Sequence, residues 1–280
     1  MSCIFHPSRQ SGCSRWIRSL ILPRHHWTNE ELFLLRVLSE NDYLYNIHRL
    51  CLPAPRLPSL QEGLFSMSEH ILLPIIIPMK DSLEELSISR LRRVDLPSLG
   101  KTLSSWSSLK RLRLSVDPDE VDNLPLDLEE PSKERETFIV SKNKDDPHSS
   151  TRGLGSSLTS LILDNGGPCI PATEIVKVVK ASSGNLTTLV LSHCFSVTFD
   201  TLVACLKLCP SLETLILLSL DLELSNSFSL AHYQTKACLP IMHELKTFIM
   251  GGCSIFHEKM DWLGRCSPNL EVLVSVTYII

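Results

Sequence analysis

His193 and Cys194 place a base beside a nucleophile, and this is the feature of the sequence closest to a catalytic site. Nucleophilic catalysis by a thiol requires that the base lie within hydrogen-bonding reach of the sulfur. Adjacent residues at the end of a strand point to opposite sides of the sheet. We therefore do not expect these two residues to form a catalytic dyad.

Two cysteine–histidine pairs have a spacing that a zinc site could use: Cys253 with His257, and Cys238 with His243. A structural zinc ion needs four ligands, and no second pair at ligand spacing accompanies either one. The glycine pairs at 166–167 and 251–252 lack the lysine and glycine spacing of a phosphate loop, so turns are predicted there. No group of residues combines a nucleophile or metal with a base and an orienting group. The sequence predicts no catalytic residues, no metal, no cofactor and no enzymatic activity.

The elements that would carry these residues follow a recurring pattern, apolar-x-x-Leu-x-Leu. Within each copy the leucines alternate with other residues, and this period of two indicates a strand with the leucines on one face. Most copies begin 25 to 36 residues after the previous copy, close to the 20–29 residues of a leucine-rich repeat. Units of this period cannot bury their apolar faces alone and must stack on their neighbours. The copies begin at Ile17, Ile47, Leu83, Leu109, Leu158, Leu186, Leu212 and, more loosely, at Leu245 and Leu270.

The segments between the predicted strands favour helices in the clearer units. Residues 198–208 and 173–181 carry apolar side chains at helical spacing, and Thr28 followed by acids indicates a helix over 27–39. Alternating strands and helices predict an α/β leucine-rich-repeat solenoid, a horseshoe with parallel strands on the concave face and helices on the convex face. We interpret residues 1–280 as one solenoid of about nine or ten units.

One spacing, from Leu109 to Leu158, is 49 residues, and a polar stretch fills it. Residues 117–136 carry nine acids against two bases, and such a composition cannot drive burial. We predict a flexible acidic and polar insertion over residues 117–155, with a degenerate strand at 137–141. The alternative to a solvated loop is an acidic arm that steers a basic partner.

Charge and cysteine usage limit the classes of partner and compartment. The net charge of −4 and the pI of about 6.2 give no support for nucleic-acid binding, and no apolar stretch is long enough to predict a membrane span. The ten cysteines include no CxxC pair, which favours reduced thiols in a cytoplasmic or nuclear protein. Residues 1–29 resemble a transit peptide in composition, but the first strand pattern falls within them.

The second half of the chain contains a cysteine motif within the leucine pattern. The motif reads L-x-L-x-x-C-x-x-[I/V]-T, then a later leucine, then C-P-x-L-x-x-L-x-L, with a looser second copy from Met250. It is carried by Leu189, Leu191, Cys194, Val197, Thr198, Leu202, Cys209, Pro210, Leu212, Leu215 and Leu217. By this motif, the region from about Leu158 to Leu273 resembles the cysteine-containing leucine-rich repeats of F-box proteins.

The resemblance implies that Cys194 and Cys253 are structural, packing into the turn after a strand and satisfying backbone groups there. It also implies a repeat region that selects substrates for ubiquitin-dependent degradation, beside an F-box that binds the adaptor of a cullin–RING ligase. The F-box pattern is not evident: Leu22-Pro23 and Glu31-Leu32 are too far apart and the later tryptophan is missing. We expect a receptor half that binds such an adaptor only if an F-box lies upstream.

The repeat register assigns the residues that lie on the concave face. The central x of Leu-x-Leu is isoleucine or valine in the last five units, and arginines occupy the fourth unit. An apolar stripe rimmed by polar groups marks a protein-binding site, although β-branched residues also favour strands by themselves. The predicted partner-binding residues are Arg111, Arg113, Ile162, Val190, Ile216, Ile249 and Val274.

The sequence therefore predicts a non-enzymatic protein–protein recognition module that binds a protein on its concave face. By resemblance it is an F-box-like substrate receptor. The alternative is a leucine-rich-repeat scaffold or immune-sensor fragment unrelated to ubiquitin. The last strand, which is apolar, is expected to be an exposed sheet edge.

Overall fold

The structure is a computed structural model, and it describes most of the repeated elements of the chain. The described residues are 17–22, 29–40, 44–53, 72–91, 96–103, 105–116, 157–164, 170–182, 184–220, 222, 241–253 and 264–276.

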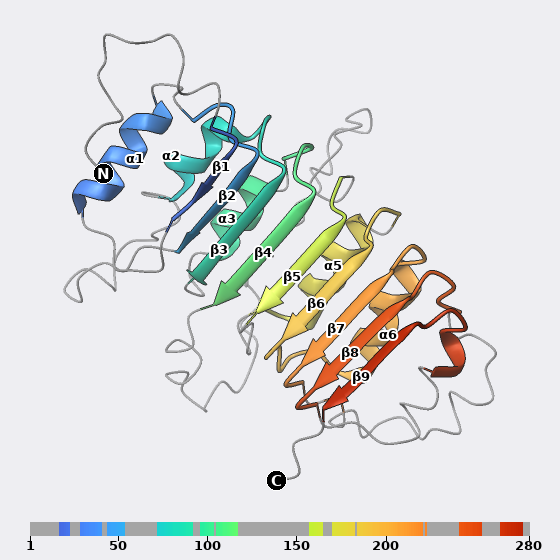
Figure 1. Ribbon diagram of the computed structural model, residues 1–280. Helices are drawn as coiled ribbons and strands as arrows, with labels where there is room; N and C mark the ends of the chain where they lie inside the picture. The colour runs from blue at the N-terminus through green and yellow to red at the C-terminus, as the bar shows by residue number, and fades with distance from the viewer. Residues whose placement is uncertain are drawn as a thin grey trace, which may run out of the picture.

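Nine strands in the described part of the chain form one parallel sheet, and their order in the sheet is their order in the chain (Figure 1). Each strand pairs only with its sequence neighbours, so the sheet grows by one strand per unit. Every strand lies where the leucine pattern predicts one, so the α/β class and the parallel strands are confirmed. The strands are β1 (Ser19–Ile21), β2 (Arg49–Pro53), β3 (Glu85–Leu91), β4 (Arg111–Val116), β5 (Ser160–Asp164), β6 (Thr188–Ser192), β7 (Thr214–Leu218), β8 (Thr247–Gly251) and β9 (Val272–Val276).

Helices connect several of the strands, and α3, α5 and α6 lie behind the sheet in the view of Figure 1. The helices predicted over 27–39, 173–181 and 198–208 are present within one or two residues of those bounds, as far as the chain is described. The helical elements are α1 (Asn29–Glu40), α2 (Leu73–Ile76), the 3-10 helix η2 (Ile77–Met79), α3 (Leu96–Leu103), α5 (Ala172–Ala181) and α6 (Phe199–Leu208).

Helix α6 shows how the local sequence sets the bounds of a helix. The Thr198 hydroxyl accepts a hydrogen bond from the Thr201 amide at 3.3 Å and caps the first turn. Asp200 in the first turn and Lys207 in the last turn complement the helix dipole. Pro210 lacks the amide needed to continue, so the helix ends at the preceding turn.

The core lies between the sheet and the helices, and the leucines of the repeated pattern supply it. Each Leu-x-Leu pair points both leucines to the helix side, where register stacks Leu189 between Leu161 and Leu215. These side chains are buried, and so are the helix residues Ile175 and Leu202. Full burial of one leucine contributes about 2 kcal/mol, so repetition of the pattern builds the stability of the stack.

Strand β9 departs from this arrangement because its side chains are exposed on both faces. Leu273 continues the leucine column beyond Phe248 but is 57% exposed. Val272, Val274 and Val276 are also exposed. The expectation that the last strand is an apolar exposed edge is confirmed.

The same backbone contact joins every unit to the one before it. Two successive amides at the start of a strand donate to a single carbonyl of the preceding unit: Glu84 and Glu85 donate to His48, and Lys110 and Arg111 donate to Glu84, at 2.8 to 2.9 Å. The contact recurs at the start of each strand from β2 to β9. The units are therefore structurally equivalent even where their sequences diverge.

The insertion predicted over 117–155 and the degenerate strand at 137–141 lie outside the described residues. Strands β4 and β5, which flank this stretch, pair directly through Leu112 with Leu161 and Leu114 with Leu163. The sheet therefore continues from the fourth unit to the next without interruption. None of the helices in the described part of the chain combines the length and apolar character needed to cross a bilayer.

Candidate functional site

The face of the sheet opposite α3, α5 and α6, here called the open face, carries the x residues of each Leu-x-Leu. Within the described residues, no helix covers this face in Figure 1. Because parallel register aligns equivalent residues, the x positions form columns that run across the strands. One column holds Ser160, Thr188, Thr214 and Thr247, and the next holds Ile162, Val190, Ile216, Ile249 and Val274.

The second of these columns, here called the apolar column, contains the five aliphatic residues predicted for partner binding. Register pairs Ile162 with Val190, Val190 with Ile216, and Ile216 with Ile249. These four side chains are partly exposed, and Val274 at the sheet edge is 40% exposed. The sequence prediction of a continuous aliphatic stripe outside the core is confirmed as geometry, whereas its binding role stays a prediction.

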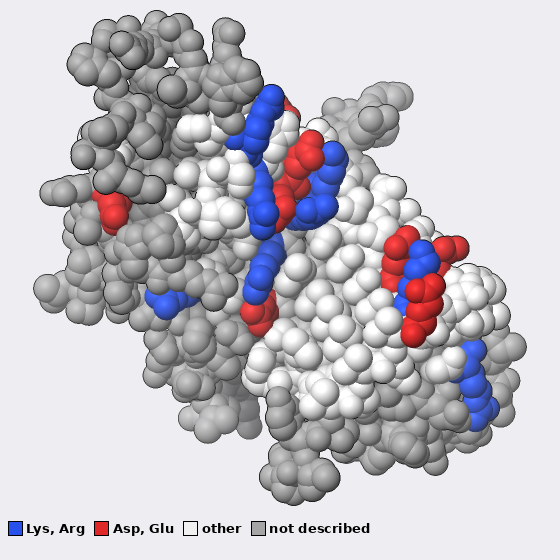
Figure 2. Space-filling view, viewed as in Figure 1, with Lys and Arg blue, Asp and Glu red and all other residues white. Residues whose placement is uncertain are grey.

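Charged side chains occupy the open face of β2, β3 and β4: Arg49, Glu85 and Arg111 continue the column of Ser160, and Arg113 continues the apolar column, in which Cys51 and Ser87 precede it. Figure 2 shows a band of charge there, a largely uncharged surface over the following strands, and a second charged group farther along the sheet. Glu85 lies between two arginines, with Arg49 Nε at 2.9 Å from one carboxylate oxygen and Arg111 Nη1 at 3.3 Å from the other. Arg113 Nη2 lies 3.6 Å from Asp164. Both predicted arginines therefore lie at the border of the apolar column.

These arginines line a hollow of about 590 Å³ over β1 to β5, here called the basic groove. Its charged lining residues are Arg49, Glu85, Arg90, Arg111, Arg113 and Asp164.

Arg90 reaches the basic groove through an irregularity in β3. The register between β3 and β4 shifts between Ile88 and Leu91, and Arg90 has a left-handed φ of 61°. Ser89 and Arg90 are consecutive residues that are both partly exposed, whereas Ile88 and Leu91 are buried. In a regular strand Arg90 would alternate toward the core. The bulge instead adds a cation to the open face.

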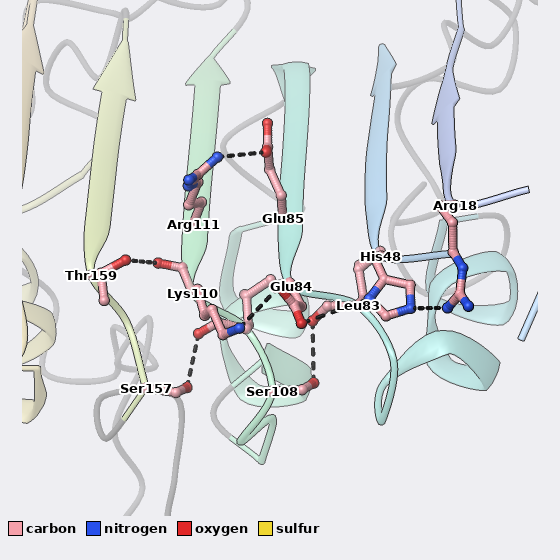
Figure 3. A network of polar contacts seen from close by, with 11 residues as sticks. Arg18, His48, Leu83, Glu84, Glu85, Ser108, Lys110, Arg111, Ser157 and Thr159 are labelled. Atoms are coloured by element: carbon pink, nitrogen blue, oxygen red, sulfur yellow. Dashed lines mark hydrogen bonds and ion pairs between the residues drawn. The ribbon is translucent and has the colours of Figure 1, made fainter. Parts of the chain in front are cut away.

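The residues that precede the strands form a second polar row, separate from the basic groove (Figure 3). Arg18 Nη1 lies 2.6 Å from His48 Nε2, and His48 Nδ1 lies 3.6 Å from Glu84. Because a guanidinium only donates, Nε2 must accept, so the proton of the neutral imidazole lies on Nδ1, toward Glu84. Lys110 Nζ completes the row at 2.9 Å from the other oxygen of Glu84.

This row lowers the pKa of Glu84. The hydrogen bond from Lys110 is the largest of the favourable contributions, and His48 adds to it, while partial desolvation opposes them. The row holds one acid, Glu84, which lies next to His48 and Lys110 of the neighbouring units, and with Arg18 the row keeps an excess of one positive charge. It therefore presents less unpaired charge than the basic groove.

Serine and asparagine side chains also join the units, a feature that the leucine pattern alone did not reveal. Ser108 Oγ donates to the carbonyls of Lys80 and Leu83, and Ser157 Oγ donates to that of Leu109 (Figure 3). Ser211 and Asn269 make equivalent contacts to the preceding unit. All four residues directly precede the first apolar residue of a unit, so an extended pattern, Ser/Asn-apolar-x-x-Leu-x-Leu, would have identified them.

Cys194 and Cys253 occupy equivalent positions in the turns after β6 and β8. Both are buried. Cys194 Sγ lies 3.8 Å from the Leu163 carbonyl of the preceding unit and 3.4 Å from that of Ser192. Cys253 Sγ lies 3.5 Å from the carbonyls of Leu217 and Gly251. The expected structural role of these cysteines, in which the thiol satisfies backbone carbonyls, is confirmed.

His193 and Cys194 do not form a dyad. His193 is exposed with a left-handed φ of 51°, and its Nδ1 lies 2.8 Å from the Ser192 hydroxyl, whereas Cys194 points inward. Ser219 and Gly252 also have left-handed φ at the equivalent position. The chain therefore turns at Gly252, whereas Gly251 of the predicted pair is the last residue of β8. The turn predicted at 166–167 lies outside the described residues. Burial raises the pKa of Cys205 and of Cys209 to about 12, so these thiols stay protonated at neutral pH.

The predicted absence of a zinc site involves residues only partly described, since Cys238 and His257 lie outside the described residues. Among the side chains that the structure does describe, no three of His, Cys, Asp or Glu gather closely enough to hold a metal ion. Comparison of the chain with protein-family models, curated proteins and solved structures found no match.

Proposed function

We propose that the chain is a leucine-rich-repeat solenoid that acts as a non-enzymatic protein-recognition module and binds its partner on the open face. One observation carries the proposal: four aliphatic side chains, Ile162, Val190, Ile216 and Ile249, stand in register outside the core. Their apolar surface is flanked by the Ser160, Thr188, Thr214 and Thr247 column.

Contiguous exposed apolar surface with a polar rim is typical of a protein-binding site. The shape of the unit supports the same function, because a sheet that grows by one strand per unit offers an extended surface for a partner. Burial also supports a non-catalytic role. It raises the pKa of four described thiols, Cys205, Cys209, Cys253 and Cys266, and reactive cysteines need lowered pKa values.

Within this class, the cysteine-containing motif favours an F-box-like substrate receptor in ubiquitin-dependent degradation. Cys194 and Cys253 make the structural contacts that the resemblance implies. The alternative is a scaffold or immune-sensor repeat region with no link to ubiquitin. Co-purification of the full-length protein with a cullin–RING adaptor separates the two, since only the first requires that adaptor.

The open face is tested by the double substitution Val190→Asp with Ile216→Asp. Both side chains point away from the core, but they are partly exposed and lie directly opposite each other, so strand propensity and the repulsion of two neighbouring carboxylates together cost on the order of 1–2 kcal/mol. Proteins captured from cell extract are quantified by mass spectrometry on wild-type and variant baits. We expect the partners of the wild-type protein to be lost from the variant.

The matched control replaces two exposed hydrophobic residues outside the apolar column, Phe195→Asp with Ile241→Asp. These residues are 48% and 59% exposed, and the substitution has the same chemistry. If the column variant keeps its circular dichroism spectrum and still captures every partner that the control captures, the proposed function is wrong.

A further inference from the structure

The basic groove carries more positive charge than its own carboxylates neutralise. Among its described lining residues, four arginines face two acids, Glu85 and Asp164, which leaves an excess of two positive charges. Glu85 is shared between Arg49 and Arg111, and the contact of Arg113 with Asp164 is long, at 3.6 Å. Each guanidinium has five N–H donors, so most of these donors are left for another acceptor.

Folding energy does not account for this gathering of arginines. The side chains of Arg49, Arg111 and Arg113 are 50%, 67% and 44% exposed, and ion pairs at such sites contribute less than about 1 kcal/mol. Arg90 reaches the groove only through a bulge with a left-handed backbone, a conformation that costs about 1–2 kcal/mol in a residue with a side chain. A strained residue that adds a cation to a hollow is a mark of function.

The apolar column and the basic groove meet at β5, where Ile162 lines the groove and is also the first residue of the column. Register pairs Arg113 of β4 with Ile162 of β5, so a charged position and the first aliphatic position are one strand apart, about 4.8 Å. Four strand spacings, from Arg113 to Ile249, give about 19 Å. An extended segment of about six residues covers this distance.

We infer that the open face binds a protein segment with a cluster of carboxylates at one end and aliphatic residues in about the next six positions. The carboxylates of Asp or Glu side chains occupy the basic groove, where arginine forks match carboxylate geometry. The aliphatic residues lie along Ile162, Val190, Ile216 and Ile249. This inference rests on the proposed use of the open face as a binding surface and adds the chemistry of the partner.

The test uses a yeast-displayed library of random 20-residue segments, sorted for binding to the purified full chain. Three variants are then compared with it: Arg111→Ala with Arg113→Ala, Val190→Asp with Ile216→Asp, and the control Lys180→Ala with Lys207→Ala. The control removes the same charge from exposed positions on the helices α5 and α6. Circular dichroism verifies that each variant is folded.

We expect the selected segments to be enriched in adjacent Asp and Glu residues with aliphatic residues beside them. Charge-assisted hydrogen bonds are strong enough that loss of two arginines weakens binding by about tenfold or more, while the lysine control changes it less than about twofold. Binding also weakens as salt is raised.

The outcomes separate this inference from the proposed function. The acidic partner is overturned if the selected segments lack acids, or if they bind the arginine variant as tightly as the wild type. In that case the proposed function still holds if the same segments no longer bind the Val190 and Ile216 variant. If no selected segment depends on either variant, or none is selected, both are overturned.

Discussion

Substitution of two leucines in the same core column tests whether the stack ends at β9. Leu189 is fully buried between Leu161 and Leu215, whereas Leu273 occupies the equivalent position in β9 and is 57% exposed. Replacement of either residue by alanine removes the same atoms. The two substitutions therefore differ only in what surrounds the side chain.

The expected costs follow from burial. Leu189→Ala loses the transfer free energy of the removed atoms and leaves a cavity closed by the neighbouring strands and helices, for about 3 kcal/mol. Leu273→Ala loses less than half of that transfer term and leaves no closed cavity, for about 1 kcal/mol or less. With a urea m-value of about 3 kcal/mol/M, the unfolding midpoint falls by about 1 M for the first variant and about 0.3 M for the second.

Urea unfolding followed by far-ultraviolet circular dichroism and by tryptophan fluorescence measures both variants. Two probes are needed because repeat arrays unfold in parts when their cooperativity breaks down. Equal costs for the two variants, within about 0.5 kcal/mol, would refute the reasoning. That result would mean that β9 is covered in solution, by a further element or by another molecule.

Three further predictions concern a carboxylate, two thiols and the strand-ending turns. The lowered pKa of Glu84 gives a stabilisation that is fully present above the ordinary carboxyl value and is lost as pH falls through the folded value, so Glu84→Gln should cost less than about 1 kcal/mol at neutral pH and progressively less as pH falls below the ordinary carboxyl value, measured by urea unfolding. Cys205 and Cys209, with pKa values of about 12, should resist alkylation by iodoacetamide at pH 8 in the folded protein, while the partly exposed Cys51 reacts. Mass spectrometry that finds Cys205 alkylated before Cys51 would contradict this prediction. At the left-handed turns, Gly252→Ala should lower the unfolding free energy by about 1 kcal/mol and Ser219→Gly should not lower it, as measured by thermal unfolding.

The leucine pattern predicts the sheet because one physical requirement sets both the sequence period and the strand. Each unit must bury Leu-x-Leu on its neighbours, so the pattern survives even in the looser copies that form β8 and β9. Register follows as well, because equivalent leucines stack in equivalent units. The positions of the apolar column therefore follow from the sequence alone.

The charged part of the site is only partly visible in the same pattern. Arg49, Glu85 and Arg111 each directly precede the leucine at the fourth position of the pattern. Aligned units therefore place a cation, an anion and a cation side by side, and this alternation could have been predicted. Arg90 could not, since the regular alternation of a strand assigns it to the core and only the bulge exposes it. A bulge depends on how two particular strands fit together, and no residue type at this position indicates it.

The division of the open face has a structural cause in the units themselves. The core residues of the Leu-x-Leu pairs are leucine or isoleucine from β2 to β7, so the units pack on one another in the same way whatever residues stand at the x positions. Arg113 and Ile162 can therefore be neighbours without disturbing the packing of the core, because their side chains point away from it. The same scaffold can therefore hold a charged half and an aliphatic half side by side. A partner that contacts only one half would leave the other without a role, so recognition across the border at β4 and β5 accounts for both.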